Sequence, residues 1–213
     1  MANFTRVGYG QVEPNQLSAQ KTGQIYASLP LAEEVQVLQN GEFMYYDYAT
    51  GKVTAEGQGE PMLVFNEIKL YEEFWRTSYK DFAMIRVGDN YVTSKLATAG
   101  YGDGALTVGA PDANHTEYGY RMDGIAPRLL KTNLGDIYTT NMVALGAEYA
   151  VGDKLVPTVV ENEYQTADGS TETYKTLVLT KNDSPAATDV VWVVGKVYTM
   201  PDGQPGLKVQ RIQ

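Results

Sequence analysis

The chain has 213 residues, which is long for one small β-barrel and comfortable for two domains. Its formal net charge is −9 and its Lys and Arg residues do not cluster, which argues against a nucleic-acid binder. The absence of cysteine excludes disulfides, thiolate catalysis and zinc–thiolate sites. No stretch approaches the roughly 18 apolar residues of a membrane span, and the N-terminus lacks the apolar core of a signal peptide. We therefore expect a soluble protein made in the cytoplasm that contacts neither nucleic acid nor membrane.

The first 30 residues follow no regular pattern. Their apolar side chains are scattered among Gly, Asn, Gln and Pro, without a period of 2 or 3.6 over any window. An idle flexible tail is one interpretation, but such tails are usually poor in aromatic and β-branched residues. We therefore predict an extended N-terminal arm, residues 1–30, whose apolar groups have no local partner and become ordered only against another chain. Its contact candidates are Phe4, Tyr9, Ile25 and Tyr26.

The pair Asn40-Gly41, flanked by apolar runs, is the strongest hairpin signal in the chain. It predicts strands near residues 34–39 and 42–48 that pair with each other. A turn at residues 49–52 follows, and an apolar run comes after it.

Two tyrosines on the second of these strands, Tyr46 and Tyr48, share one face, so that face meets either a partner or water. The chain contains 16 Tyr against 5 Phe, and Tyr is typical of interfaces as well as of strands. We therefore count Tyr46 and Tyr48 as two further contact candidates.

One segment has a helical period. Ile68, Tyr71 and Trp75 recur at i, i+3 and i+7, and Asn66 is a suitable N-cap. This spacing predicts a short helix over residues 67–75 whose aromatic stripe is buried in the core.

Strand patterns resume at residues 82–87 and 91–96. Residues 100–120 are rich in Gly, Asp and Asn, which predicts a long loop or a weakly paired hairpin. We place a domain boundary near residues 124–127. The elements before it predict a β domain, sandwich-like or barrel-like with one short helix, over residues 31–125.

The last third of the chain is a series of short β-type runs cut by Gly, Asp and Pro. Strands at residues 158–165 and 172–179 are expected to form a hairpin. Residues 190–194 predict a central strand, and residues 207–212 a closing strand. The expected fold class is therefore mainly β, with two small β domains after the arm, the second a compact barrel over residues 126–213 that folds independently.

The sequence shows no recognisable set of catalytic residues. Its one histidine, His115, lies in the Gly-rich loop and has no triad partners in sequence. Asp112, Asn114 and Glu117 resemble the start of a calcium loop, but Glu117 stands where that loop needs Gly. We predict no catalytic residue, no metal site and no cofactor. Paired acids for glycoside hydrolysis remain an alternative, because any two acids can converge in a fold.

The arm at residues 8–26 is followed by a β domain and then by a barrel containing Gly135-Asp-Ile-Tyr-Thr-Thr-Asn141 and Val151-Gly-Asp-Lys154. This sequence resembles tailed-bacteriophage virion proteins of the head decoration or auxiliary capsid type over most of its length. The resemblance implies a non-enzymatic structural protein that is made in the host cytoplasm and docks on the assembled shell. Its partners would be the major capsid protein and other copies of itself, and its arm and β domains would bridge neighbouring shell subunits.

Two other classes of function stay open. A carbohydrate-binding or host-attachment module would use exposed Tyr faces and should show an aromatic platform. A glycan-processing β enzyme should show a pocket holding two or more acids.

Overall fold

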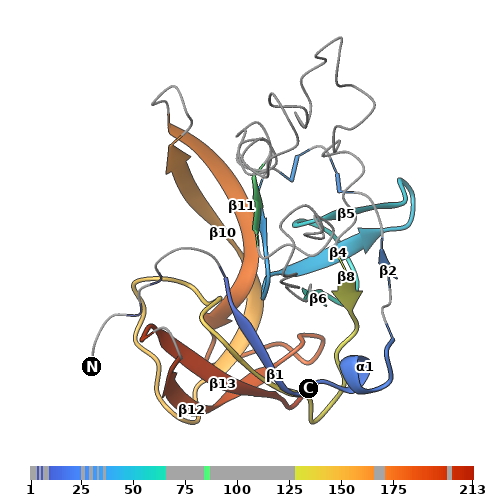
Figure 1. Cartoon of the computed structure of the whole chain (residues 1–213). Coiled ribbons are helices and arrows are strands. Elements are labelled where there is room, and N and C mark those ends of the chain that lie inside the picture. Colours follow the sequence, from blue (N-terminus) through green and yellow to red (C-terminus); the bar gives the residue numbers. More distant parts are fainter. Residues whose placement is uncertain are drawn as a thin grey trace, which may run out of the picture.

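The computed structural model describes residues 4, 6, 10–24, 27–28, 31–32, 34–35, 37–65, 84–86, 128–165, 171–200 and 203–213. In these residues the chain is mainly β: an antiparallel sheet curls into a half-barrel, and the one helix is α1 (Ser18–Lys21) (Figure 1). The prediction of a mainly β fold is thus confirmed. Within the same residues, no helix is long and apolar enough to cross a membrane.

Eleven strands form one sheet, and a separate pair of strands lies beside it. The order in the large sheet is β1 (Val12–Gln16), β9 (Ile137–Thr140), β13 (Pro205–Arg211), β12 (Trp192–Thr199), β10 (Lys154–Gln165), β11 (Thr171–Lys181), β4 (Phe43–Asp47), β6 (Met62–Val64), β8 (Arg128–Leu130) and β2 (Ala27–Ser28), with β5 (Lys52–Thr54) also paired to β4. The separate pair is β3 (Val37–Gln39) and β7 (Met84–Arg86). Strands from both predicted β domains therefore share one sheet, joined where Leu177 pairs with Phe43 and where β6 pairs with β8. The domain division and the independent folding of residues 126–213 stay predictions.

The core of the half-barrel is centred on Trp192, which is fully buried. The rings of Tyr138 and Phe43 lie 5.0 and 6.1 Å from the Trp192 ring between centroids. Leu207 and Val209 of β13 point into the same cluster because alternate residues of a strand share a face. The segment at residues 190–194, predicted as the central strand, thus supplies the centre of the core.

The strands β4, β6 and β8 are buried on both faces. Phe43 and Leu63 face the Trp192 cluster, whereas their neighbours Met44 and Val64 face a second cluster on the other side of the sheet. This explains why the segment of β6 reads as a continuous apolar run and not as an alternating one.

The predicted hairpin at Asn40-Gly41 is wrong in its pairing. β3 pairs with β7, whereas β4 pairs with β5, β6 and β11. Gly41 does adopt a positive φ of 91°, and its N–H donates to the Val64 carbonyl oxygen at 2.9 Å. The turn therefore carries the chain from the β3–β7 pair to the large sheet. β4 pairs there because its buried neighbours offer more apolar contact than β3 does.

Three other local predictions are confirmed. β10 and β11 form the predicted hairpin, with pairs running from Leu155–Lys181 to Gln165–Thr171. β4 and β5 are joined by the predicted turn at residues 49–52. The closing strand β13 lies between β12 and β9, in the interior of the sheet.

Several predictions lie outside the described residues. They are the helix at residues 67–75, the strand at 91–96, the loop at 100–120 with His115, and the boundary at 124–127.

Candidate functional site

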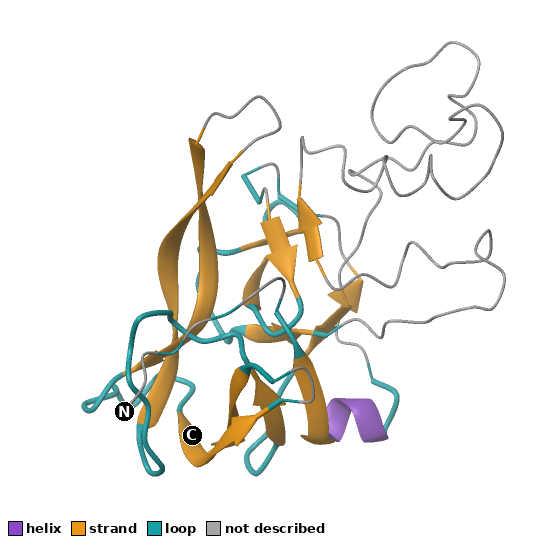
Figure 2. Ribbon diagram, turned by 60° about the vertical axis from the view of Figure 1, so that its left-hand side comes forward, coloured by secondary structure: helices purple, strands orange, loops and turns teal. Residues whose placement is uncertain are grey.

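The hairpin of β10 and β11 extends beyond the half-barrel as a two-stranded ribbon (Figure 1 and Figure 2). The sheet holds only its base: β12 pairs with Lys154 and Leu155, and β4 pairs with Leu177. Among the described strands, none pairs with the outer edges of residues 156–165 or 171–176. An edge of this kind presents a row of backbone N–H and C=O groups to which another strand can add.

Charged side chains stand on the projecting half of the ribbon. Glu161, Glu163 and Lys175 are exposed, and Asn162 donates from Nδ2 to Oγ1 of Thr176 at 2.8 Å across the two strands. Charged residues on a strand edge limit uncontrolled association. The charges on the ribbon therefore disfavour non-specific strand addition along this edge.

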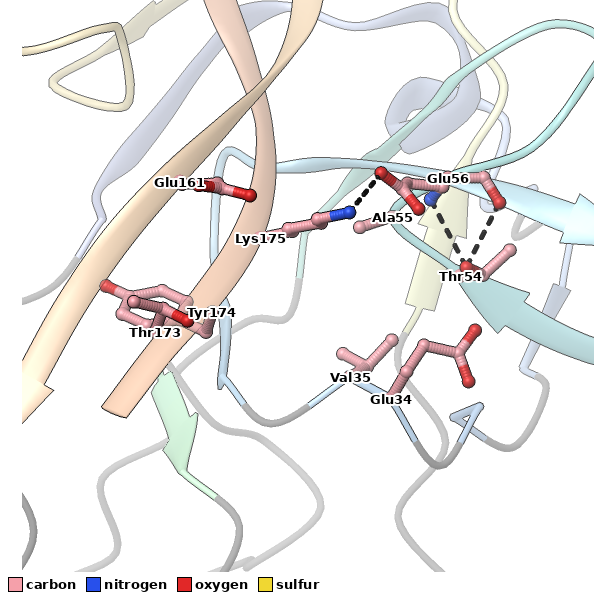
Figure 3. Close-up of a pocket in the computed structure, with 9 residues that line it drawn as sticks. All are labelled: Glu34, Val35, Thr54, Ala55, Glu56, Glu161, Thr173, Tyr174 and Lys175. Carbon is pink, nitrogen blue, oxygen red and sulfur yellow. Dashed lines mark hydrogen bonds and ion pairs between the residues drawn. The ribbon is translucent and has the colours of Figure 1, made fainter. Parts of the chain in front are cut away.

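A cavity of about 360 Å³ lies between the ribbon and the segment around β5 (Figure 3). Residues from three separate stretches of the chain line it: Glu34, Val35, Thr54, Ala55, Glu56, Glu161, Thr173, Tyr174 and Lys175. Lys175 crosses the space to Glu56, with Nζ 2.7 Å from Oε1 (Figure 3). This hydrogen bond raises the pKa of Lys175, with smaller help from the nearby charge of Glu161.

Three glutamates and one lysine give the cavity a formal charge of −2, which favours cationic or hydroxyl-rich ligands. The side chains of Lys175 and Glu56 are 47% and 58% exposed, so water screens their ion pair. The described part of the chain holds no group of three His, Cys, Asp or Glu side chains that would bind a metal ion. The pocket with two or more acids that an enzyme should show is thus present, without a metal centre in those residues.

The β4–β5 hairpin carries the exposed aromatic pair. The rings of Tyr46 and Tyr48 meet edge to face with centroids 4.4 Å apart, and Tyr48 is 76% exposed. The Asp47 carboxylate fixes the turn by accepting bonds from the Thr50 hydroxyl at 2.6 Å and the Ala49 N–H at 2.9 Å. These bonds lower the pKa of Asp47, that from Thr50 most. The hairpin therefore presents the exposed Tyr48 side chain to solvent beside a turn that Asp47 stabilises.

The N-terminal residues that the structure describes lie against this same chain. β1 pairs with β9, the Phe4 ring packs edge to face on Tyr149 with centroids 5.5 Å apart, and Leu17 is only 2% exposed. The prediction that residues 1–30 become ordered only against another chain is thus wrong for Phe4, Leu17 and β1, which lie against this chain. The partners are remote in sequence, which is why local patterns gave no sign of them.

Polar side chains of the body bind the backbone of the N-terminal segment. The Gly10 N–H donates to Oε1 of Gln39 at 2.8 Å, and the Gln11 N–H donates to Oδ1 of Asn141 at 2.7 Å. The Thr140 hydroxyl in turn donates to the Gln11 carbonyl oxygen at 2.7 Å. A Cβ at Gly10 would collide with the carbonyl oxygen of Asn40, so only glycine fits at this crossing. We call this set of contacts the N-terminal seat.

A buried carboxylate lies next to the N-terminal seat. Glu42 is fully buried, and neither carboxylate oxygen has a hydrogen-bond partner in the described residues. Burial raises the pKa of Glu42 well above its usual range, and the charge of Arg6 opposes this more weakly. Arg6 itself donates to the Met142 sulfur at 2.9 Å, and burial lowers its pKa.

The predicted contact residues are distributed over these places. Phe4 is in the core, Tyr46 is half-buried and Tyr48 is exposed. Tyr9, Ile25 and Tyr26 lie outside the described residues. Whether any of the six contacts another chain stays a prediction. Sequence reasoning missed the cavity and Glu42. The cavity gave no local signal, whereas Glu42, a charge beside an apolar strand, did give one.

No family model, curated protein or solved structure matches this chain.

Proposed function

We propose that this chain is a non-enzymatic virion structural protein that docks on the shell of a tailed bacteriophage and bridges neighbouring subunits. The observation that carries the proposal is the ribbon, whose outer edges over residues 156–165 and 171–176 pair with no strand among the described residues. Strand addition to such an edge gives affinity through backbone hydrogen bonds, and the side chains beside it give specificity. These edges are therefore open for a partner strand in the part of the chain that the structure describes.

The tyrosine pair supports a docking role. Aromatic side chains are enriched at the centres of interfaces, and Tyr48 stands in water on a turn fixed by Asp47. The partners would be the major capsid protein and other copies of this chain. Each copy would bury on the order of 1,000 Å² and would stabilise the shell by binding only its assembled state.

The finer layout belongs to the same proposal. It consists of an N-terminal arm at residues 1–30, a β domain at 31–125 and a C-terminal barrel at 126–213, made in the host cytoplasm and incorporated in the virion. The resemblance to head decoration proteins supports this layout.

The test is sedimentation of the purified chain with shells assembled from the major capsid protein of the same phage. A variant in which residues 160–176 are replaced by Asn-Gly keeps the base of the ribbon and removes its projecting half. We expect this variant to lose at least tenfold in affinity for the shell. Val151→Ser, at an exposed position on another loop, is the matched control and should bind as the parent chain does. Equal binding by the shortened ribbon would contradict the proposal.

A second candidate function is glycan binding or hydrolysis, because the cavity has room for a sugar ring and holds three carboxylates. The discriminating experiment is a screen of glycans for binding and for hydrolysis. Glu161→Gln and Glu56→Gln would each abolish a true hydrolytic activity, whereas the structural proposal expects no turnover in the parent chain.

A further inference from the structure

In the described residues, the bonds that attach the N-terminal segment to the body go to residues remote in sequence. β1 pairs with β9 from Val12–Thr140 to Gln16–Ile137, and the Ser18 N–H donates to the Asp136 carboxylate at 3.0 Å. Phe4 exchanges backbone hydrogen bonds with the loop after β9 at 3.0 Å. A second copy of the chain carries the same acceptor groups, so it offers the segment the same bonds.

The segment joins the body through an exposed turn directly after α1. Residues 20–24 are all exposed, and Gly23 holds the turn with a φ of 67° and no atom within 4 Å of where a Cβ would stand. The Gly23 N–H donates to the Gln20 carbonyl oxygen at 3.1 Å, and the Gln24 N–H to that of Ala19 at 2.7 Å. Straightening this turn loses these local bonds to water and disturbs no buried side chain of its own.

Opening the segment also exposes a buried carboxyl group. Glu42 lies under the seat with no hydrogen-bond partner in the described residues, and Arg6 is the cation of the segment that faces it. Opening would give both groups back to water, which offsets part of the lost contact area. An open chain, however, leaves β9 as an uncovered sheet edge and Leu17 in water, which favours rapid recapture of a segment.

We propose that the N-terminal segment, described at Phe4, Arg6 and residues 10–19, exchanges between two copies of this chain, each copy placing its segment in the N-terminal seat of the other, with the turn at residues 20–24 as the hinge. The closed and exchanged forms contain the same seat contacts and differ only at the hinge, which makes this a low-cost route to a dimer. The protein concentration then sets the ratio of exchanged dimer to closed monomer. The closed monomer is favoured at low concentration because its own segment has a high effective local concentration at the seat. The inference goes beyond the proposed function, because the exchange needs only this chain and no shell.

The hinge provides the first test. Gly23→Val strains the closed turn, since a β-branched residue is strongly disfavoured at this φ, and the straightened hinge relieves the strain. We expect light scattering of the full chain at high concentration to show at least a tenfold larger dimer fraction for Gly23→Val. Gly51→Val is the matched control: Gly51 has a φ of 69° and also no atom within 4 Å, but its turn joins two strands that stay together. Its dimer fraction should equal that of the parent chain.

The second test shows where the segment binds. The chain has no cysteine, so one copy carrying Gln16→Cys and another carrying Ile137→Cys can join only through the introduced residues, which face each other in the β1–β9 ladder. On mixing and oxidation we expect a disulfide between the two copies. Asp47→Cys mixed with Lys52→Cys, a facing pair inside the β4–β5 hairpin, should give none above background. A Gly23→Val chain that stays monomeric, or dimers without the 16–137 disulfide, would overturn the proposal.

Discussion

The two ends of the β10–β11 hairpin belong to the same strands but differ in surroundings. At the base, Leu155, Leu177 and Leu179 are buried against the Trp192 cluster. In the projecting half, Glu161 and Lys175 are exposed. The difference teaches that the sheet uses only part of each strand for folding. The outer half contributes fewer side chains to the core, and we propose that it serves in binding.

Disrupting the core at the base of the β10–β11 hairpin should cause the largest loss of stability. Trp192→Ala removes the largest side chain of the core and the ring contacts to Tyr138 and Phe43. We expect a loss of about 3–5 kcal/mol in the free energy of unfolding, measured by urea denaturation. The ribbon-shortened variant is the comparison. If it loses as much stability as Trp192→Ala, the projecting half has a folding role after all.

Glu42 should cause a pH-dependent loss of stability. Because burial raises its pKa, stability is fully present below the ordinary carboxyl range and falls as the pH rises toward the raised value. Glu42→Gln should remove this dependence of the free energy of unfolding on pH, whose slope is at most about 1.4 kcal/mol per pH unit. The measurement is the melting temperature from pH 4 to pH 9, with Glu161→Gln, an exposed acid on the ribbon, as control. A parent chain without this slope would contradict the assignment.

The next prediction is a small gain in stability from a change inside the core. The hydroxyl of Tyr138 is buried and has no hydrogen-bond partner in the described part of the chain. Removing a buried donor of this kind without leaving a cavity relieves its desolvation. Tyr138→Phe should therefore raise the free energy of unfolding by about 1 kcal/mol. A loss of stability would show that the hydroxyl has a partner after all.

The smallest effect should come from the ion pair in the cavity. Lys175 and Glu56 are exposed, so water already solvates both charges. Lys175→Ala, Glu56→Ala and the double variant should all melt at the parent temperature. A clear coupling in this double-mutant cycle would show that the pair ties the ribbon to the β5 segment.

The sequence predicted elements whose signals are local. The β10–β11 hairpin and the closing strand β13 were readable because alternation and turn residues lie within one short stretch. The hairpin at Asn40-Gly41 failed because its turn signal carries no information on which strand offers the better apolar face. The position of β1 beside β9 was not readable for the same reason, since no local pattern encodes a partner more than a hundred residues away.

The sequence singled out the tyrosine pair as contact residues, and that role stays a prediction. Tyr46 and Tyr48 were recognised from strand alternation, and the structure places their rings together on the β4–β5 hairpin. The cavity brings Glu56 and Glu161 to one space from distant strands, and this convergence exists only in the folded chain. The burial of Glu42 likewise depends on the crossing of the N-terminal segment, which is a tertiary contact.

The most direct measurement of the central claim is an electron-microscopy reconstruction of phage shells with this chain bound. The account predicts that the projecting half of the ribbon lies against a shell subunit, with a strand of that subunit beside residues 156–165 or 171–176. A map in which the chain is bound but both ribbon edges point into solvent would contradict it.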